Sequence, residues 1–252
     1  MARHLIFHPE LDDSLAVGAR LTLGGEEAHH AARVKRLDLG AAVGVCDGRG
    51  RRAACVVRAI DKDPRAGWTL TLEVTRAERV PPEIPRLEVW AAAPKGARLE
   101  DMIEGLSEVG AASVRPLVTE RTVVEPRAGK LDRLGRLAAE SLKQCGRAWL
   151  LEIQPPATLA EALVPPAPDA RVVVADASGQ LYQASGGTHH RLLIGPEGGW
   201  TPRELSTLRE EGARIASFGP HVMRVETAAV VAASIMMHEE RRAMREALNR
   251  KA

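Results

Sequence analysis

Aromatic side chains are scarce in this sequence, at 3% of its 252 residues. The core must therefore be built from alanine, valine, leucine and isoleucine, and stacking platforms for nucleic-acid bases would be few. Any bound nucleic acid would be held mainly by charge. The hydrophobic share of 45% and the charged share of 27% are typical of a globular protein with one or two domains.

Cysteine is also rare. The three cysteines, Cys46, Cys55 and Cys145, are odd in number and lack Cys-x-x-Cys spacing, which argues against a disulfide framework and against a zinc site. Residues 1–13 contain no apolar core followed by a cleavage site, and no apolar run approaches the ~18 residues that span a membrane. We therefore expect a cytoplasmic protein in a reducing compartment.

Two common nucleotide-binding motifs are missing. No Gly-x-Gly-x-x-Gly follows a predicted strand and no Gly-x-x-x-x-Gly-Lys-Ser/Thr occurs, so neither a Rossmann site nor a P-loop is supported. The pairs His29-His30 and His189-His190 do not indicate a metal, because adjacent side chains point to different faces and no cysteine or acid completes a ligand set. We expect no metal and a cofactor site of another kind.

The formal net charge of +2 is too small to indicate a polyanion ligand by itself. The basic residues of the N-terminal part do gather in two short runs. These runs are Arg33, Lys35, Arg36 and Arg49, Arg51, Arg52. They would form a phosphate-binding patch if both share a face, and a solvated surface if they do not.

Residues 1–77 are predicted to form a small β-rich domain. The expected strands span 4–8, 20–23, 42–46, 53–60 and 69–75, and many of their residues are β-branched. One helix is expected at 26–36, with acids in its first turn and bases in its last, as the helix dipole prefers. Residues 78–85 contain three prolines and are the natural linker.

Residues 86–252 alternate between apolar strands and segments of helical periodicity, which predicts an α/β domain with a parallel sheet. The expected strands span 87–93, 114–118, 172–175, 192–194 and 215–218. Amphipathic helices are predicted at 98–109 and at 131–142, the second ended by Cys145-Gly146. A last helix begins near Glu226, apolar at first and then charged.

The segment 192–204 reads as a strand, a glycine-rich turn and a helix start. Thr201 can cap this helix, Pro202 suits its first position, and Glu204 completes a capping box. The turn's three glycines would let the backbone approach a nucleotide closely, although a purely structural connection is the simpler interpretation. The segment 218–229 has the same form, so that two turns could close over one ligand.

These two segments closely resemble those of the RsmE family, the bacterial 16S ribosomal RNA uracil-N3 methyltransferases of the SPOUT superfamily. The family's Gly-Pro-Glu-Gly-Gly motif stands at 195–199, and its Leu-Arg-x-Glu-Thr-Ala motif at 223–228. Similarity also extends over Arg33-Val-Lys-Arg36, Lys95, residues 103–120 and residues 144–147. Two positions depart from many relatives, His221 in place of Arg and Met223 in place of Leu or Ile.

The resemblance implies an N-terminal PUA-like RNA-binding β-barrel and a C-terminal SPOUT domain with a trefoil knot. It implies S-adenosylmethionine as cofactor, 16S rRNA of the small ribosomal subunit as substrate, and a homodimer, with no membrane and no metal. The implied cofactor-binding residues are Leu193, Ile194, Gly195, Pro196, Glu197, Gly198, Gly199, Phe218, Gly219, Val222, Met223, Arg224, Thr227 and Ala228.

Arg224 and Glu226 are the candidate catalytic residues. Methylation at N3 requires loss of a weakly acidic ring proton, so we expect Arg224 to stabilise negative charge on the uracil oxygens. Glu226 would orient Arg224 or accept the proton through water, although a surface ion pair or a helix cap is the simpler interpretation. Glu197 is expected to accept hydrogen bonds from backbone amides rather than act as a base.

The candidate RNA contacts are Arg3, Arg33, Arg36, Arg98 and Arg121. Two alternatives to this function remain open. The first is a non-catalytic RNA-binding or ribosome-assembly factor that kept the fold, against which the intact glycines of the turn at 195–199 argue. The second is a SPOUT enzyme acting on another base or on ribose in transfer RNA, against which the full-length agreement argues.

Overall fold

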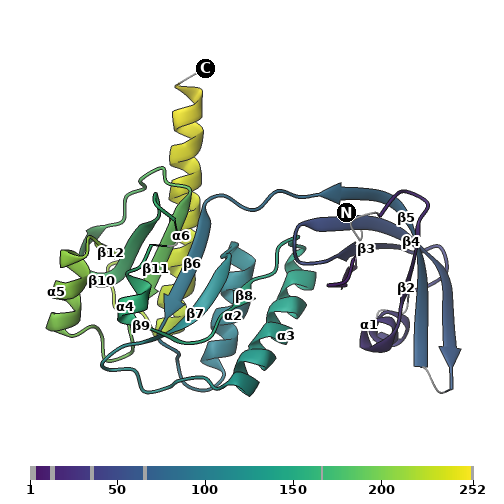
Figure 1. Cartoon of the computed structure of the whole chain (residues 1–252), viewed down its shortest axis with the longest axis horizontal. Helices are drawn as coiled ribbons and strands as arrows, with labels where there is room; N and C mark the ends of the chain where they lie inside the picture. Colours follow the sequence, from purple (N-terminus) through teal and green to yellow (C-terminus); the bar gives the residue numbers. More distant parts are fainter. Residues whose placement is uncertain (1–3, 12–14, 35–36, 65–66, 166, 251–252) are drawn as a thin grey trace. The chain divides into compact units, whose positions relative to one another are not determined.

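The computed structural model describes residues 4–11, 15–34, 37–64, 67–165 and 167–250 (Figure 1). The chain divides into two compact units, each with its own sheet. The first comprises Met1–Pro82 and Leu142–Leu150, and the second comprises Glu83–Ser141 and Leu151–Ala252. Among the helices of the described residues, none has the length and apolarity that crossing a membrane requires.

The first unit is built on a five-stranded sheet in the order β1-β3-β4-β5-β2. All neighbours are antiparallel except β1 and β3. The strands are β1 (Leu5–Phe7), β2 (Arg20–Leu23), β3 (Ala42–Cys46), β4 (Arg51–Asp63) and β5 (Gly67–Arg79). The predicted β-rich module is confirmed, and its two longest strands extend several residues beyond their predicted ends because they pair along almost their whole length.

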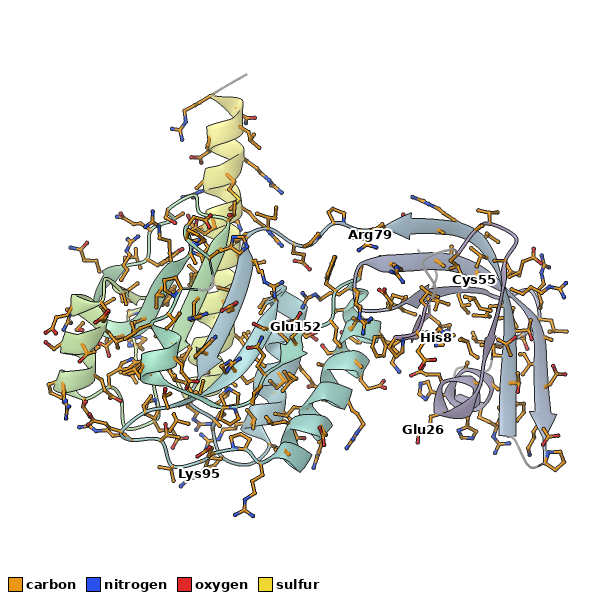
Figure 2. The ribbon with its side chains drawn as sticks, viewed as in Figure 1. His8, Glu26, Cys55, Arg79, Lys95 and Glu152 are labelled. Carbon is orange, nitrogen blue, oxygen red and sulfur yellow. The ribbon has the colours of Figure 1, made fainter. Side chains whose placement is uncertain are left out.

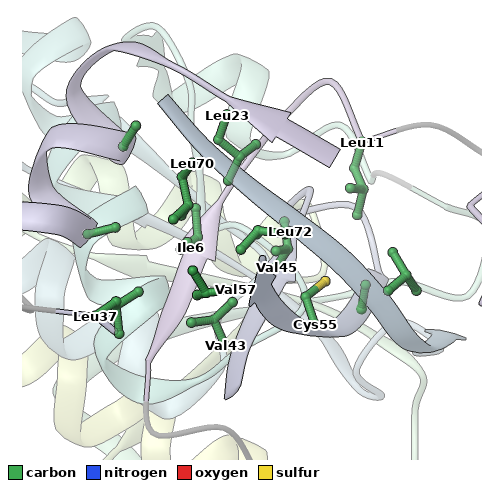
Figure 3. Close-up of a cluster of buried hydrophobic side chains, with 14 residues drawn as sticks. Ile6, Leu11, Leu23, Leu37, Val43, Val45, Cys55, Val57, Leu70 and Leu72 are labelled. Carbon is green, nitrogen blue, oxygen red and sulfur yellow. The ribbon is translucent and has the colours of Figure 1, made fainter. Parts of the chain in front are cut away.

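Aliphatic side chains from these strands converge on one core (Figure 3). Val43 and Val45 of β3 and Leu70 and Leu72 of β5 are completely buried, each two residues apart as the pleat requires. Ile6 of β1 packs in the same cluster. The expectation of an aliphatic core is therefore confirmed for this unit.

The single helix of this unit departs from its prediction. An α-helix, α1 (Gly25–His29), passes directly into a π-helical turn, η1 (His30–Val34). The wider turn accompanies the burial of Ala28 and Ala31 in the core of the sheet. The prediction of a regular α-helix over 26–36 is thus wrong in its second half, and positions 35–36 lie outside the described residues.

The second unit contains a sheet in the order β12-β10-β11-β6-β7-β8, with β9 paired to β7. Every pair is parallel, which confirms the predicted α/β architecture. The strands are β6 (Arg86–Ala91), β7 (Ser113–Val118), β8 (Glu152–Ile153), β9 (Ala157–Thr158), β10 (Arg171–Leu181), β11 (His189–Ile194) and β12 (Arg214–Ser217). Strand β10 runs well past its predicted end, because it resumes pairing with β12 after a register shift.

Helices cover both faces of this sheet. Val174, Leu193 and Trp90 lie in register on neighbouring strands and share one core cluster with residues of α4 and α5. Helices α2 and α6 pack together, and α6 also contacts β6 and β11 (Figure 1). The helices are α2 (Arg98–Val109), α3 (Ala128–Cys145), α4 (Leu159–Ala162), α5 (Pro202–Glu210) and α6 (Val225–Asn249).

Candidate functional site

A cavity of about 750 Å³ opens at the carboxyl ends of β11 and β12 and beside residues 175–177 of β10. The carboxyl edge of a parallel sheet is where α/β folds bind ligands, and this volume lies within the ~300–1,000 Å³ typical of ligand pockets. Its lining comes from α2, from β10, from the two predicted turns and from the start of α6. The lining residues are Arg98, Ala175, Asp176, Ala177, Ile194, Gly195, Pro196, Glu197, Gly199, Trp200, Ser217, Phe218, Gly219, His221, Val222, Met223, Arg224, Val225, Ala228 and Ala232.

The glycine-rich turn is anchored by Trp200. Its indole Nε1 donates a hydrogen bond of 3.1 Å to the carbonyl of Ala175, at the end of the neighbouring strand. A Cβ atom on Gly195 would lie 2.9 Å from this indole, so the position tolerates only glycine without rearrangement. Gly199 has a φ of +69°, a left-handed conformation that also favours glycine. Two of the turn's glycines are therefore required by the local packing and backbone.

The turn leads into α5 through the predicted capping box. Thr201 Oγ1 accepts a hydrogen bond from the amide of Glu204 at 3.2 Å, and Glu204 Oε2 accepts one from the amide of Thr201 at 2.8 Å. This confirms the predicted helix start. The other oxygen of Glu204 accepts a bond of 2.9 Å from the amide of Glu120, which ties the loop after β7 to the same turn.

Two arginines hold the turn itself. Arg98 Nη1 lies 2.7 Å from Glu197 Oε1, and Arg121 Nη1 donates a 2.7 Å hydrogen bond to the carbonyl of Gly198. The expectation that Glu197 bonds backbone amides is thus wrong for the described residues, because its carboxylate is paired with a guanidinium instead. The sequence also predicts both arginines as RNA contacts, and that role stays a prediction.

The second turn rests on a buried aromatic pair. Phe218 stacks on Tyr182 with ring centroids 5.2 Å apart, and the Tyr182 hydroxyl donates to the carboxylate of Glu240 in α6. Burial, together with this carboxylate, raises the pKa of Tyr182 well above its usual value. Glu240 also accepts bonds from the amides of Ser185 at 2.9 Å and Gly186 at 2.7 Å. The floor of the cavity is therefore fixed to α6.

The candidate catalytic residues lie at the junction of this turn with α6. Arg224 precedes the helix, is exposed and is one of the residues that line the cavity. Glu226 lies in the first helical turn, and its Oε2 is buried without a hydrogen-bond partner. Within the part of the chain that the structure describes, no ion pair joins the two side chains. The predicted orienting contact between Glu226 and Arg224 is thus not seen in this geometry.

Most of the implied cofactor residues line the cavity, but three do not. Leu193 points into the core cluster on the opposite face of the sheet, as alternation along β11 requires. Gly198 faces Arg121, and Thr227 lies exposed on α6. Of the other predicted RNA contacts, Arg33 is exposed in η1, whereas positions 3 and 36 lie outside the described residues.

Sequence reasoning missed part of the lining. Ala175, Asp176 and Ala177 reach the cavity from β10, and Trp200 and Ala232 close it from the turn and from α6. The available signal was the short stretch Asp176-Ala-Ser-Gly179, which follows an apolar strand directly but lacks the proline and the helix start of the two other turns. Lys95, singled out by the family resemblance, follows the end of β6 (Figure 2) and is not among the lining residues.

Comparisons with known proteins define the class. Residues 82–237 match the family model of an RNA methyltransferase domain, and residues 23–64 match that of an RNA methyltransferase PUA domain. Ribosomal RNA small subunit methyltransferase E of Synechocystis is 33% identical over 92% of this chain and 76% of its own length. The protein of that name from Mycobacterium tuberculosis is 32% identical over 85% of both chains. The chain belongs to the ribosomal RNA small subunit methyltransferase E family.

Solved structures share the fold. A methyltransferase of Legionella pneumophila, determined with bound SAM, superposes with a TM-score of 0.77 at 25% identity, over 93% of this chain and 97% of its own. The ribosomal RNA small subunit methyltransferase E of Neisseria gonorrhoeae, bound to S-adenosyl methionine, gives a TM-score of 0.82 at 22% identity over the same shares.

Proposed function

We propose that this protein transfers the methyl group of S-adenosylmethionine to N3 of one uridine in the 16S rRNA of the small ribosomal subunit. Membership of the family supports the reaction class and the substrate, and the SAM-bound relative from Legionella supports the cofactor. The observation that carries the proposal is the convergence of the two turns, at 195–199 and at 218–224, on one cavity.

The cavity fits this cofactor in size and in chemistry. Glycines at 195, 199 and 219 place no side chain between the backbone of the two turns and a ligand, and Phe218 and Met223 supply apolar walls for an adenine. When bound, S-adenosylmethionine supplies an electrophilic methyl group on a sulfonium centre. The protein's own task is to hold the uridine in line with that methyl group and to favour loss of its N3 proton.

Arg224 is suited to stabilise the uridine anion. Its guanidinium is exposed at the cavity, so it can reach the uracil oxygens on which negative charge develops. Its carbonyl already accepts the first hydrogen bond of α6, from Ala228 at 2.7 Å, which fixes the backbone from which the side chain extends. Glu226 is not among the cavity-lining residues, and one of its carboxylate oxygens is buried without a hydrogen-bond partner; we propose it as the acceptor of the N3 proton through water.

The remaining elements of the proposal concern assembly. We assign RNA binding to the N-terminal PUA-like unit through its basic residues, including Arg3, Arg33 and Arg36. Arg98 and Arg121 would contribute RNA contacts beside the turn that they hold. We further propose that the C-terminal segment is threaded as a trefoil knot, that the active form is a homodimer, and that it acts in the cytoplasm.

Mass mapping of 16S rRNA from a deletion strain tests the function. Loss of a single N3-methyluridine, restored by the wild-type gene and not by an Arg224→Ala gene, is the expected result. An unchanged modification map with lost subunit assembly would instead identify a non-catalytic assembly factor. A change confined to another base, to ribose or to transfer RNA would replace the proposed substrate.

A further inference from the structure

Asp176 is a carboxylate in the cavity that neither the family motifs nor the proposed catalytic step uses. It follows Ala175, which pairs with Ile194 at the end of β11, so Asp176 stands level with the first glycine of the glycine-rich turn. We propose that Asp176 binds the ribose hydroxyls of the cofactor and so selects an adenosyl group. This inference rests on the proposed function, because it assumes that S-adenosylmethionine occupies the cavity.

The local fold holds Asp176 in place. Strand β10 leaves its pairing with β12 after Ala175 and resumes it at Gln180, so residues 176–179 form an excursion. Gly179 closes the excursion against the neighbouring strand, where a Cβ atom would lie 2.6 Å from the backbone of Ile215. No larger residue fits there without moving the strand. The packing of Gly179 against β12 therefore fixes the conformation of residues 176–179 beside the cavity.

One oxygen of Asp176 maintains this excursion and the other is left for a ligand. Oδ1 accepts hydrogen bonds from the amide of Ser178 at 2.9 Å and from its hydroxyl at 2.6 Å. Among the described residues, no hydrogen bond engages Oδ2 and no cation pairs with the carboxylate. Asp176 thus offers one free, charged acceptor that is already oriented.

The other charges of the cavity favour ribose as the partner. Glu197, the second carboxylate of the lining, is neutralised by Arg98. The remaining basic residues of the lining, His221 and Arg224, lie on the other turn, and Arg224 is already assigned to the uracil oxygens. A ribose diol consists of two hydroxyl donors and needs an acceptor, which Asp176 provides.

The placement also follows a general rule of parallel sheets. In dinucleotide-binding folds, an acidic residue that accompanies the glycine-rich turn hydrogen-bonds the ribose hydroxyl. In this protein β10 pairs with β11 as far as Ala175, and Asp176 follows directly, so an acid and a glycine-rich turn meet at one sheet edge. An acid beside a glycine-rich turn would thus bind ribose hydroxyls here, as it does in dinucleotide-binding folds, although the order of the strands differs.

Calorimetry with two probes tests the assignment. Both probes carry adenine and ribose, but S-adenosylhomocysteine also carries the amino-acid part, which 5′-methylthioadenosine lacks. Asp176→Asn keeps an oxygen for Ser178 and replaces the free oxygen with a donor. The variant should therefore bind both probes more weakly by the same factor, roughly ten- to hundredfold. Asp169→Asn is the matched control, an exposed aspartate elsewhere in the unit, and should change neither.

The results separate this inference from the function on which it rests. Failure of the wild-type protein to bind S-adenosylhomocysteine would overturn both. Normal wild-type binding with no loss in Asp176→Asn would overturn the assignment alone. A loss of affinity for S-adenosylhomocysteine alone would also overturn the assignment, because it would place Asp176 against the amino-acid part.

A ligand series tests the role of the diol first on the wild-type protein. The wild-type protein should prefer adenosine to 2′,3′-dideoxyadenosine in competition with S-adenosylhomocysteine, again by roughly tenfold or more. Asp176→Asn should lose most of this preference, provided that its melting temperature matches the wild type. Equal affinity of the wild-type protein for the two nucleosides would refute the role of the diol.

Discussion

Arg98 Nη1 lies 2.7 Å from Glu197 Oε1, which joins the start of α2 to the glycine-rich turn. The contact links residues 99 positions apart in sequence, and Arg121 holds the next residue of the turn through its carbonyl. Because both guanidiniums grip the turn that lines the cavity, they are positioning residues for the proposed cofactor. Their role as RNA contacts stays a prediction.

The first prediction concerns this ion pair. Arg98→Ala should weaken S-adenosylhomocysteine binding about three- to tenfold, because the turn loses one of its two side-chain anchors, while an exposed pair contributes only ~0–1 kcal/mol to stability. Titration calorimetry measures the affinity and thermal melting the stability. Arg133→Ala, which breaks the exposed contact with Glu100 at 3.0 Å, is the control and should leave binding unchanged.

The double variant Arg98→Ala/Glu197→Ala sharpens that test. If the two side chains act through each other, the double variant binds no more weakly than the worse single one. Independent, additive losses would show that each side chain contacts the ligand separately, and would remove the positioning role.

Arg224 should affect the rate more than the affinity. Removing a preorganised charge from the site where negative charge develops lowers the rate about a hundredfold or more. The Arg224→Ala protein should therefore methylate small ribosomal subunits more slowly by that factor in single-turnover experiments. Arg224→Lys, which keeps the charge without the planar fork, should recover part of the loss. A wild-type rate in a folded, cofactor-binding Arg224→Ala protein would contradict the assignment.

Local features of this molecule could be predicted from the sequence, and long-range ones could not. The capping box of Thr201 and Glu204 and the helix at 98–109 were correct because they depend on residues within one or two turns. The helix end at Gly146 was correct for the same reason, as its φ of +76° shows.

Several of the missed features depend on distant partners. The sequence shows that Arg98 is charged but not that Glu197 lies beside it, and nothing near Gly179 reveals the strand that requires its missing side chain. Leu142–Leu150 joins the first unit although α3 begins in the second, and periodicity alone carries no sign of that division.

The cysteines should differ sharply in reactivity. Burial raises the pKa of both the Cys46 and the Cys55 thiols to about 11, so only roughly one molecule in a thousand carries either thiolate at pH 8. Cys145 is exposed. Ellman's reagent should therefore label one thiol in the native protein and all three after unfolding, and Cys145→Ser should abolish the native reaction. Rapid labelling of a second thiol would contradict the burial of the core.

Glu240 should be a determinant of stability. Its carboxylate is fully buried and accepts hydrogen bonds from the Tyr182 hydroxyl and from the amides of Ser185 and Gly186. In Glu240→Gln one amide NH₂ would face these donors, so the free energy of unfolding should fall by roughly 2–4 kcal/mol. Urea denaturation measures the loss. Tyr182→Phe, which removes one donor and leaves the carboxylate paired with amides, should cost less.

Tyr182 is the single tyrosine of the chain, so its ionisation can be followed directly by absorbance. Burial and the neighbouring Glu240 carboxylate raise its pKa in the folded state, and the folded protein therefore holds the phenolic proton more tightly than the unfolded chain does. The resulting stabilisation is complete below the unfolded pKa of ~10 and is lost as the pH rises above it. The phenolate signal should consequently appear together with unfolding in alkaline titration, and a reversible signal near pH 10 from a protein that keeps its circular dichroism would show that Tyr182 is accessible to solvent.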